Sequence, residues 1–255
     1  MIFDAFQLDG RVALVTGAAR GLGQGIALGL AEAGADVVVL DVLDPDETVE
    51  RITALDRRAH PLSRDLLGLT ENRAGEIVAD AIAPFGRLDI LVNNAGIIRR
   101  APALDFRQAD WDAVLSINLS AAFLLCQAFA RQAIVAGTGG KVINMASLLS
   151  FQGGTTVPAY AAAKSGIAGM TRALANEWAQ HNINVNALAP GYFATELTSA
   201  LRADPARAEP MLGRIPAGRW GNPTDLQGAA VFLASDAAAY VHGVILPVDG
   251  GWLAW

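Results

Sequence analysis

The sequence alternates short runs of β-branched and aliphatic residues with longer helical stretches along its whole length. We expect strands at residues 12–15, 37–40, 59–65, 88–92, 141–145, 183–188 and 244–248. Nearly continuous apolar strands are typical of a sheet buried on both faces, and alternation with helices requires parallel strands joined by crossovers. The sequence therefore predicts an α/β fold with a three-layer, doubly wound parallel sheet of the Rossmann type.

Longer stretches of helical periodicity separate these runs. They lie at residues 21–33, 71–85, 109–136, 158–180 and 225–233. No linker interrupts the rhythm, so residues 1–255 are interpreted as a single domain. One irregular, proline-containing segment at about residues 195–220 follows a predicted strand end, where mobile substrate lids are commonly built.

Composition and charge exclude several classes of function. The formal net charge is −6, whereas nucleic-acid binding needs a basic surface, so we expect no nucleic-acid partner. The single cysteine, Cys126, excludes an internal disulfide, and no Cys/His group has metal-ligand spacing, so no metal site is expected. We recognise neither a secretion signal nor an apolar run long enough to span a membrane. A cytoplasmic protein without a membrane partner is therefore predicted.

The first predicted strand runs into a glycine-rich turn at residues 16–23. Gly17, Gly21 and Gly23 allow a sharp turn in which backbone N–H groups approach a pyrophosphate, and the following helix directs its positive end at the same anion. The spacing G-x-x-x-G-x-G differs from the commoner G-x-G-x-x-G, and such a turn also has a purely structural interpretation. Its position between the first strand and the first helix favours a dinucleotide site.

Asp41 ends the second predicted strand. A carboxylate there can accept hydrogen bonds from both hydroxyls of the adenosine ribose and repels a 2′-phosphate, which favours NAD over NADP. Arg20 argues the other way, because a basic residue in the glycine-rich turn could reach a 2′-phosphate. An aspartate that only caps the next turn is the structural alternative. We expect NAD as the cofactor.

Tyr160 and Lys164 lie four residues apart on a predicted helix and therefore share one face, and Ser147 lies at the end of the preceding strand. A phenol normally titrates near pH ~10, and a neighbouring ammonium together with oxidised nicotinamide would favour the phenolate. Tyr160 can then exchange a proton with an alcohol, while Ser147 hydrogen-bonds the substrate oxygen and Lys164 also holds the nicotinamide ribose. Each residue singly has an ordinary structural interpretation, but together they predict a dehydrogenase site.

Arg99 and Arg100 follow the turn at residues 93–96, next to the expected nicotinamide. In an acidic protein, adjacent arginines there suit the capture of a carboxylate, although surface loops often carry arginine without a ligand. Gln152 and Trp220 are further candidates for the substrate pocket, and packing is the alternative role for Trp220. The sequence therefore predicts a small acidic substrate.

Taken together, these motifs resemble the short-chain dehydrogenase/reductase superfamily over essentially the whole chain. The matching motifs are residues 16–23, Asn93-Asn94-Ala95-Gly96, Asn118, Ser147, Tyr160-x-x-x-Lys164 and Pro190-Gly191. The resemblance implies a catalytic tetrad of Asn118, Ser147, Tyr160 and Lys164. Asn118 is expected to bend its helix and to anchor a water through which Lys164 relays protons. The resemblance also implies a homotetramer, and the apolar residues 248–255 are expected to pack at a subunit interface.

The same resemblance implies which residues contact the cofactor. Asp65 and Leu66 match the segment that lies against adenine, and Thr195 matches the threonine that bonds the nicotinamide amide. The expected cofactor-binding residues are Gly17, Arg20, Gly21, Leu22, Gly23, Asp41, Asp65, Leu66, Asn93, Ala95, Gly96, Tyr160, Lys164, Pro190, Gly191 and Thr195.

Several segments outside these motifs are similar to a subgroup of the superfamily that acts on deoxy sugar acids in uronate degradation. They are residues 1–6, 96–100, 150–154, 175–178 and 215–221. The similarity predicts an NAD-dependent interconversion of a secondary alcohol and a ketone on an acid of the 2-deoxy-D-gluconate or 2-dehydro-3-deoxy-D-gluconate type. The basic turn at residues 18–20 departs from that subgroup and bears on the choice of coenzyme.

Other functions remain as alternatives. The fold and the tetrad serve a neutral polyol, a steroid or a β-ketoacyl substrate equally well, so only the substrate pocket discriminates between them. A β-ketoacyl reductase prefers NADPH and needs a basic patch for its carrier, which Asp41 and the net charge of −6 disfavour. A cofactor-sensing protein without catalysis is the alternative from another class, but it has no need of the complete tetrad.

Overall fold

The computed structural model describes residues 1–254, apart from the side chain of Leu197. Its centre is a seven-stranded sheet in which all neighbouring strands are parallel, in the order β3-β2-β1-β4-β5-β6-β7. The strands are β1 (Val12–Thr16), β2 (Asp36–Asp41), β3 (Ala59–Ser63), β4 (Ile90–Asn93), β5 (Gly140–Met145), β6 (Ile183–Pro190) and β7 (Ile245–Val248). The predicted doubly wound parallel sheet in a single domain is confirmed.

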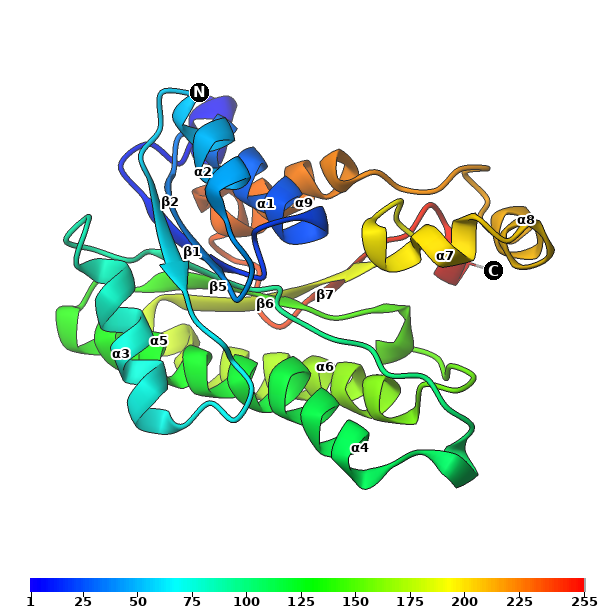
Figure 1. The fold of residues 1–255 in the computed structure, drawn as a ribbon. Coiled ribbons are helices and arrows are strands. Elements are labelled where there is room, and N and C mark those ends of the chain that lie inside the picture. The colour runs from blue at the N-terminus through cyan, green and yellow to red at the C-terminus, as the bar shows by residue number, and fades with distance from the viewer. Residues whose placement is uncertain (255) are drawn as a thin grey trace.

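Helices cover both faces of this sheet (Figure 1). On one face lie α1 (Gly21–Glu32), α2 (Asp46–Thr53) and α9 (Gln227–Ala234). On the other lie α3 (Glu71–Ile82), α4 (Gln108–Leu115), α5 (Ala122–Ala136) and α6 (Pro158–Trp178). Two shorter helices, α7 (Ser199–Arg202) and α8 (Pro205–Gly213), lie beyond the carboxyl ends of β6 and β7.

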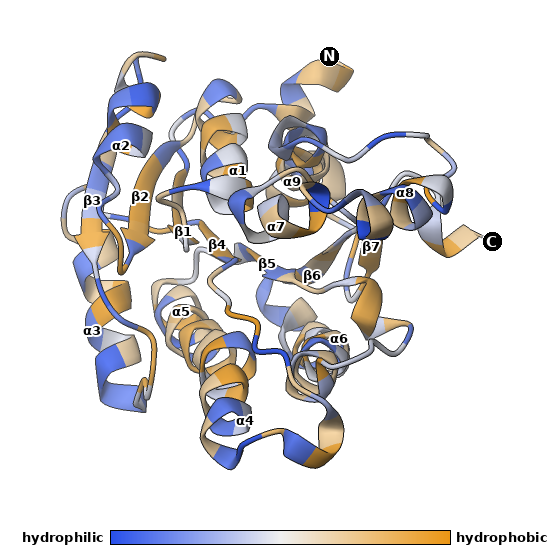
Figure 2. Cartoon of the chain, turned by 45° about the vertical axis from the view of Figure 1, so that its right-hand side comes forward, coloured by the Kyte–Doolittle hydropathy of each residue, from blue (hydrophilic) through white to orange (hydrophobic). Residues whose placement is uncertain are grey.

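The two faces of the sheet have separate hydrophobic cores, as the apolar strands require. In β1 the buried side chains alternate, with Leu14 in the core beneath α3 and α5 and with Ala13 and Val15 in the core beneath α1 and α9. Figure 2 shows the hydrophobic colour along β2, in which all residues after Asp36 are buried. This burial on both faces positions the strand ends rigidly, and those ends carry the candidate site.

The predicted helix at residues 109–136 is interrupted in its middle. Between α4 and α5, Ser116–Ala121 forms a π-helix, and the Asn118 side chain donates hydrogen bonds to the carbonyl oxygens of Val114 (2.9 Å) and Ile97 (2.8 Å). Single π-turns inside α-helices are frequent at functional sites. A π-helical turn therefore lies at Asn118, where a bend is expected, and the Asn118 side chain bonds to the backbone in two places.

The same stretch, Gln108–Ala136, is long and apolar enough to cross a membrane by length and composition. This differs from the sequence-based expectation that no such run exists. In the structure α5 packs on α3 while α4 packs on α6, and 44% of the apolar window is buried inside the molecule. Core helices of globular proteins meet the same criterion, because they too have a broad apolar face.

The C-terminal residues, which are expected at a subunit interface, also make contacts within their own chain, and the interface role stays a prediction. Trp252 is 3% exposed and packs with Leu148 and Ile215 of its own chain, while its ring lies 4.8 Å from that of Tyr192. Its apolar character is therefore satisfied within the chain. Trp255, which belongs to the same prediction, lies outside the described residues.

Candidate active site

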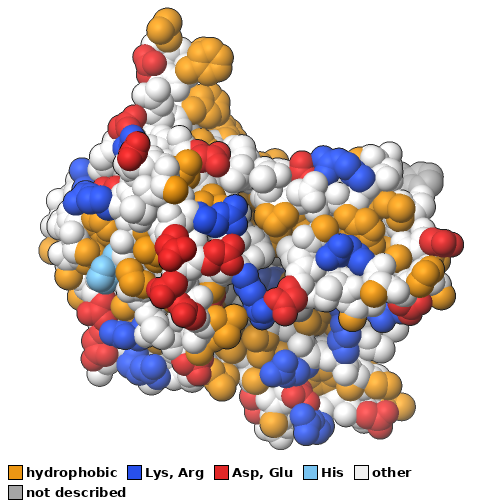
Figure 3. Space-filling model, turned by 45° about the horizontal axis from the view of Figure 1, so that its top comes forward, with side chains coloured by type: hydrophobic (Ala, Val, Ile, Leu, Met, Phe, Trp, Pro, Cys, Tyr) orange, Lys and Arg blue, Asp and Glu red, His pale blue; other side chains and the backbone are white. Residues whose placement is uncertain are grey.

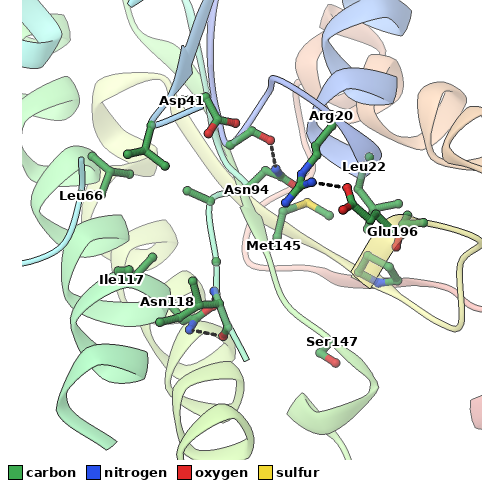
Figure 4. A pocket seen from close by; sticks show the side chains of 18 of the residues that line it. Arg20, Leu22, Asp41, Leu66, Asn94, Ile117, Asn118, Met145, Ser147 and Glu196 are labelled. Carbon is green, nitrogen blue, oxygen red and sulfur yellow. Dashed lines mark hydrogen bonds and ion pairs between the residues drawn. The ribbon is translucent and has the colours of Figure 1, made fainter. Parts of the chain in front are cut away.

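A cavity of about 610 Å³ lies at the carboxyl ends of the parallel strands, where doubly wound sheets bind their ligands. Figure 3 shows a molecule hollowed near the middle of one face, with acidic side chains gathered beside the hollow. The expected site residues that line the cavity are Gly17, Arg20, Gly21, Leu22, Asp41, Asp65, Leu66, Ala95, Gly96, Asn118, Ser147, Tyr160, Lys164, Pro190, Gly191 and Thr195. In Figure 4, Asp41 and Leu66 lie at one end of this cavity and Ser147 lies at the other.

The glycine-rich turn has the shape that a bound pyrophosphate requires. Gly17 has φ +64°, and a Cβ there would lie 2.8 Å from the Cα of Ala95. Gly21 has φ +62° and borders open space, since a Cβ there would meet only the Thr195 side chain, at 3.9 Å. Gly23 does not line the cavity. It lies against the turn instead, since a Cβ at this position would be 2.0 Å from the Gly17 carbonyl oxygen. The third glycine thus lets α1 pack against the turn, and the residues present fit a dinucleotide.

The structure places Asn94, rather than Asn93, at the cavity. Asn93 is the last residue of β4, and its amide donates to Asn144 Oδ1 (2.9 Å) and Cys126 Sγ (3.1 Å) in the core. The amide of Asn94 instead donates to the carbonyl oxygens of Thr16 (3.0 Å) and Gly17 (2.9 Å). The predicted cofactor contact of Asn93 is therefore not made by its side chain, because successive residues of a strand point to opposite faces.

Asp41 lies at the end of β2, where its buried carboxylate lines the adenosine end of the cavity. One oxygen accepts a hydrogen bond from the Ala19 N–H (2.9 Å), and the other accepts one from the Leu43 N–H (3.0 Å). Asp41 thus caps both adjoining turns, as the structural alternative stated. Each carboxylate oxygen retains a second lone pair, so this capping leaves capacity for ribose hydroxyls.

Three of the predicted catalytic side chains come together at the other end of the cavity. Ser147 follows β5, and its hydroxyl forms a hydrogen bond with the phenol of Tyr160 near the start of α6. One turn further along α6, the Lys164 ammonium lies 5.5 Å from the centroid of the Tyr160 ring and donates to the Met145 carbonyl oxygen at 2.6 Å. A strand end and one face of a helix therefore present a hydroxyl, a phenol and an amine to the same space.

Burial dominates the titration of both catalytic groups on α6. It raises the pKa of Tyr160, an effect that the hydrogen bond with Ser147 and the charge of Arg100 only partly oppose. Burial also lowers the pKa of Lys164 to about 8. The phenolate is expected from Lys164 together with oxidised nicotinamide, whereas within the protein itself desolvation disfavours the charged forms of both groups.

Asn118 fastens the loop after β4 to the π-helix. Besides donating to the Ile97 carbonyl oxygen, it accepts a hydrogen bond from the Ile97 N–H at 3.2 Å. A Cβ on Gly96 would lie 2.4 Å from the same Asn118 oxygen, so this close contact requires glycine. Through its bonds to Ile97, Asn118 thus positions the part of the loop that lines the cavity beside the catalytic end.

Comparisons with known proteins agree with this geometry. The family described as enoyl-(acyl carrier protein) reductase matches residues 17–253. A relative from Dickeya dadantii (strain 3937), named 2-dehydro-3-deoxy-D-gluconate 5-dehydrogenase, is 56% identical over 254 residues, which cover 100% of both chains. The chain belongs to the short-chain dehydrogenase/reductase family. The predictions of this family and of an oxidoreductase acting on CH–OH groups are thereby confirmed.

Solved structures of short-chain dehydrogenases share the fold over the full length. One from Agrobacterium tumefaciens, described as a candidate 2-deoxy-D-gluconate 3-dehydrogenase with bound NADP, has a TM-score of 0.94 and 56% identity, and the match covers 99% of this chain and 100% of that one. A gluconate 5-dehydrogenase from Burkholderia cenocepacia J2315, in complex with NADP and tartrate, has a TM-score of 0.93 and 41% identity, with 100% of both chains covered.

The structure separates the predicted substrate residues of this short-chain dehydrogenase. Of these, Ser147 lines the cavity, whereas Arg99, Arg100, Gln152 and Trp220 do not. Arg99 turns toward Asp110, with 3.6 Å between its Nε and the carboxylate oxygen, while Arg100 acts electrostatically on Tyr160. Trp220 packs edge-on against Tyr192, with 5.7 Å between the ring centroids, so its packing role is present. Arg100 is therefore the better placed of the two arginines.

Sequence reasoning missed several residues that border the cavity. They are Leu40, Val42, Leu43, Arg64, Asn94, Ile97, Ile117, Met145, Ala146, Phe193, Glu196 and Thr198. Most follow a strand end directly or lie one residue from an expected contact, which is the signal that could have found them. Glu196 follows the expected contact Thr195, but its ion pair with Arg20 has no signal in the sequence, because only the folded chain forms it.

Proposed function

We propose that the protein is an NAD-dependent oxidoreductase that interconverts a secondary alcohol and a ketone on a deoxy sugar acid. The observation that carries this proposal is the meeting of Ser147, Tyr160 and Lys164 at one end of a cavity whose other end contains the glycine-rich turn and Asp41. The named relatives support the substrate class, since one acts on 2-dehydro-3-deoxy-D-gluconate by its name.

The proposed mechanism assigns proton transfer to Tyr160. The nicotinamide, when bound, supplies hydride transfer and, in its oxidised form, a positive charge. Because burial raises the pKa of Tyr160, its phenol is protonated at neutral pH and can donate to the oxygen of a ketone during reduction. Ser147 hydrogen-bonds that oxygen as its charge develops, and Lys164 holds the ribose beside the phenol. Asn118 keeps the loop at Ile97 in place.

Arg100 is proposed to bind the substrate carboxylate. Its positive charge opposes the rise in pKa that burial causes at both Tyr160 and Tyr192, so the guanidinium lies near both phenols. A guanidinium can bind a carboxylate through two parallel hydrogen bonds. The tartrate in the structure of the Burkholderia relative is also a small hydroxy acid, which supports this choice.

NAD remains the proposed coenzyme, although three solved relatives contain NADP. The buried carboxylate of Asp41 lies at the adenosine end, where its charge would repel a 2′-phosphate. The cation of the glycine-rich turn, Arg20, is paired with Glu196. We also propose that residues 195–220 act as a substrate lid and that the protein is a cytoplasmic homotetramer.

A substrate panel tests the reaction. The full chain is supplied with NAD or NADH and with deoxy-hexulosonates, hexonates, neutral polyols and steroids, and NADH absorbance is followed. We expect turnover of a deoxy sugar acid and loss of at least about two orders of magnitude of that rate in Tyr160→Phe, because proton transfer typically contributes this much. Efficient turnover of a steroid with none of any sugar acid would falsify the substrate class, and full activity of Tyr160→Phe would refute the mechanism.

The two adjacent arginines provide a matched test of carboxylate binding. Arg100→Ala should raise KM for the acidic substrate by about tenfold or more, because a hydrogen bond to a charged group is lost, with a smaller effect on an uncharged analogue. Arg99→Ala, which removes the same charge from the neighbouring position, should change KM little, since Arg99 faces Asp110. Equal effects of both substitutions on charged and uncharged substrates would remove Arg100 from the site.

A further inference from the structure

An ion pair joins the glycine-rich turn to the proposed lid. Arg20, which immediately precedes Gly21 and the start of α1, pairs through Nη1 with Oε2 of Glu196. Glu196 begins the 3-10 turn Glu196–Thr198, which leads into α7 and α8. Figure 4 shows the two side chains joined at the edge of the cavity.

This pair is the long-range side-chain contact of the first part of the lid. Within the described residues, the other side-chain hydrogen bonds of this segment are local: Thr198 donates to the Phe193 carbonyl oxygen, Ser199 to that of Glu196, and Arg202 to that of Thr195. The ion pair instead joins residues that are 176 positions apart in the sequence. Without this ion pair, no described side-chain hydrogen bond would join the start of the lid to the glycine-rich turn.

The arginines that line the cavity are already paired with carboxylates among the described residues. Arg64, the other arginine lining the cavity, forms an ion pair of 2.6 Å with Asp80. Asp41 and Asp65 add negative charge to the same lining. A coenzyme with a 2′-phosphate must therefore displace a carboxylate from an arginine, whereas one with a free ribose hydroxyl has no need to do so.

The Arg20–Glu196 pair is exposed enough to be displaced. The side chains are 59% and 68% exposed, and ion pairs in such positions contribute little to stability. A phosphate monoester carries up to two negative charges and can bind a guanidinium through two hydrogen bonds, so it competes effectively with one carboxylate. A neutral ribose hydroxyl has no such charge.

We propose that Glu196 discriminates between the two coenzymes by competing with the 2′-phosphate for Arg20, so that NADP binds with the lid released from the glycine-rich turn. The proposal rests on the proposed function only in requiring that a nicotinamide dinucleotide binds. It deepens that function, because it gives the lid a direct part in coenzyme choice.

Binding measurements on the full chain test this role. Dissociation constants for NAD and NADP are measured separately by calorimetry for the wild type and Glu196→Gln. We expect NADP to bind about two- to fivefold more tightly to Glu196→Gln, which corresponds to the strength of an exposed ion pair, while NAD affinity changes less. Glu209→Gln is the matched control, because it removes the same charge from helix α8 of the lid without removing a described ion pair.

A double-mutant cycle separates competition for Arg20 from a general charge effect. In an Arg20→Gln background, Glu196→Gln should no longer change NADP affinity, because the shared partner is absent. Amide hydrogen exchange at residues 196–213 gives an independent readout. It should be faster in coenzyme-free Glu196→Gln than in the wild type, and faster in the wild type with NADP than with NAD.

Three outcomes would overturn the proposal. They are an equal change in NAD and NADP affinity, an effect of Glu196→Gln no larger than that of Glu209→Gln, and an effect that persists without Arg20. A wild-type preference for NADP would refute the coenzyme part of the proposed function alone. The role of Glu196 is judged only by how its substitution changes the ratio of the two affinities.

Discussion

Lys164 is a buried cation whose described hydrogen bond goes to a neutral carbonyl oxygen. It is 5% exposed, and its ammonium donates to the Met145 carbonyl oxygen at the end of β5. Burial lowers its pKa from 10.5 to about 8, so the folded protein stores an unfavourable charge at neutral pH. A titratable group in a cleft whose pKa is strongly shifted is typical of a functional site. The charge that the site needs then lowers the stability of the folded protein.

The cost of this charge should be visible in the pH dependence of unfolding. From about pH 8 to about 10.5 the folded lysine is neutral while the unfolded one retains its proton, so stability rises with pH through this window. Between these two pH values, the free energy of unfolding of the wild type should therefore rise, relative to that of Lys164→Met, by on the order of 3 kcal/mol. Urea unfolding of both proteins across this range measures the difference, and parallel curves would contradict the assignment.

At the scale of elements, the glycine-rich turn and the loop after β4 form one unit. The Thr16 hydroxyl accepts hydrogen bonds from the N–H groups of Asn94 and Ala95, both at 3.0 Å, and the Asn94 amide returns bonds to the turn. The motif that predicts a phosphate site therefore depends on a second motif about 78 residues later for its shape. The two segments therefore hold each other in this conformation.

Gly17→Ala tests that dependence. The added methyl would lie 2.8 Å from the Ala95 Cα, at a backbone φ of +64°, so the turn must move. Strain of this kind costs about 1–3 kcal/mol, and we expect coenzyme affinity to fall about tenfold or more. Gly75→Ala on α3, where the methyl meets nothing within 4 Å, is the control and should leave binding unchanged while stabilising the helix slightly. Unaltered affinity in Gly17→Ala would show that the turn does not bind the dinucleotide.

At the scale of the molecule, α4 and α5 retain apolar side chains on their outer surface. Trp111 is 37% exposed, Phe123 is 39% exposed and Ile134 is 40% exposed. Phe123 and Ile134 lie eleven positions apart, about three helical turns, and therefore share one face of α5. Figure 2 shows hydrophobic colour along both helices. Exposed apolar side chains that share a helix face are typical of an interface, which supports the proposed tetramer.

Light scattering after gel filtration tests the assembly. The wild type should have a mass about four times the 26.6 kDa of one chain, whereas Ile134→Glu should lower it, because a charge is costly to bury at an apolar interface. Leu55→Glu introduces the same charge at another exposed apolar residue, beyond α2, and should leave the mass unchanged. A monomeric wild type would refute the tetramer.

The fold and part of the cavity lining could be predicted from local patterns, whereas residues such as Asn118, Leu66 and Thr195 are expected only from the family resemblance. Apolar runs buried on both faces require a layered sheet, and residues such as Gly17, Asp41 and Ser147 follow strand ends, which all meet at one edge of a parallel sheet. Tyr160 and Lys164 share a helix face by their spacing alone. These placements need no knowledge of distant neighbours.

The remaining features depend on contacts between segments far apart in the chain. The choice of Asn94 over Asn93, the orientation of Arg100 and the ion pair of Arg20 with Glu196 all required folded neighbours. The directions of the pKa shifts at Tyr160 and Lys164 also required the folded chain, since desolvation is a property of everything packed around a group. Periodicity and spacing act within one segment, whereas burial and long-range pairing exist only once the segments have packed together.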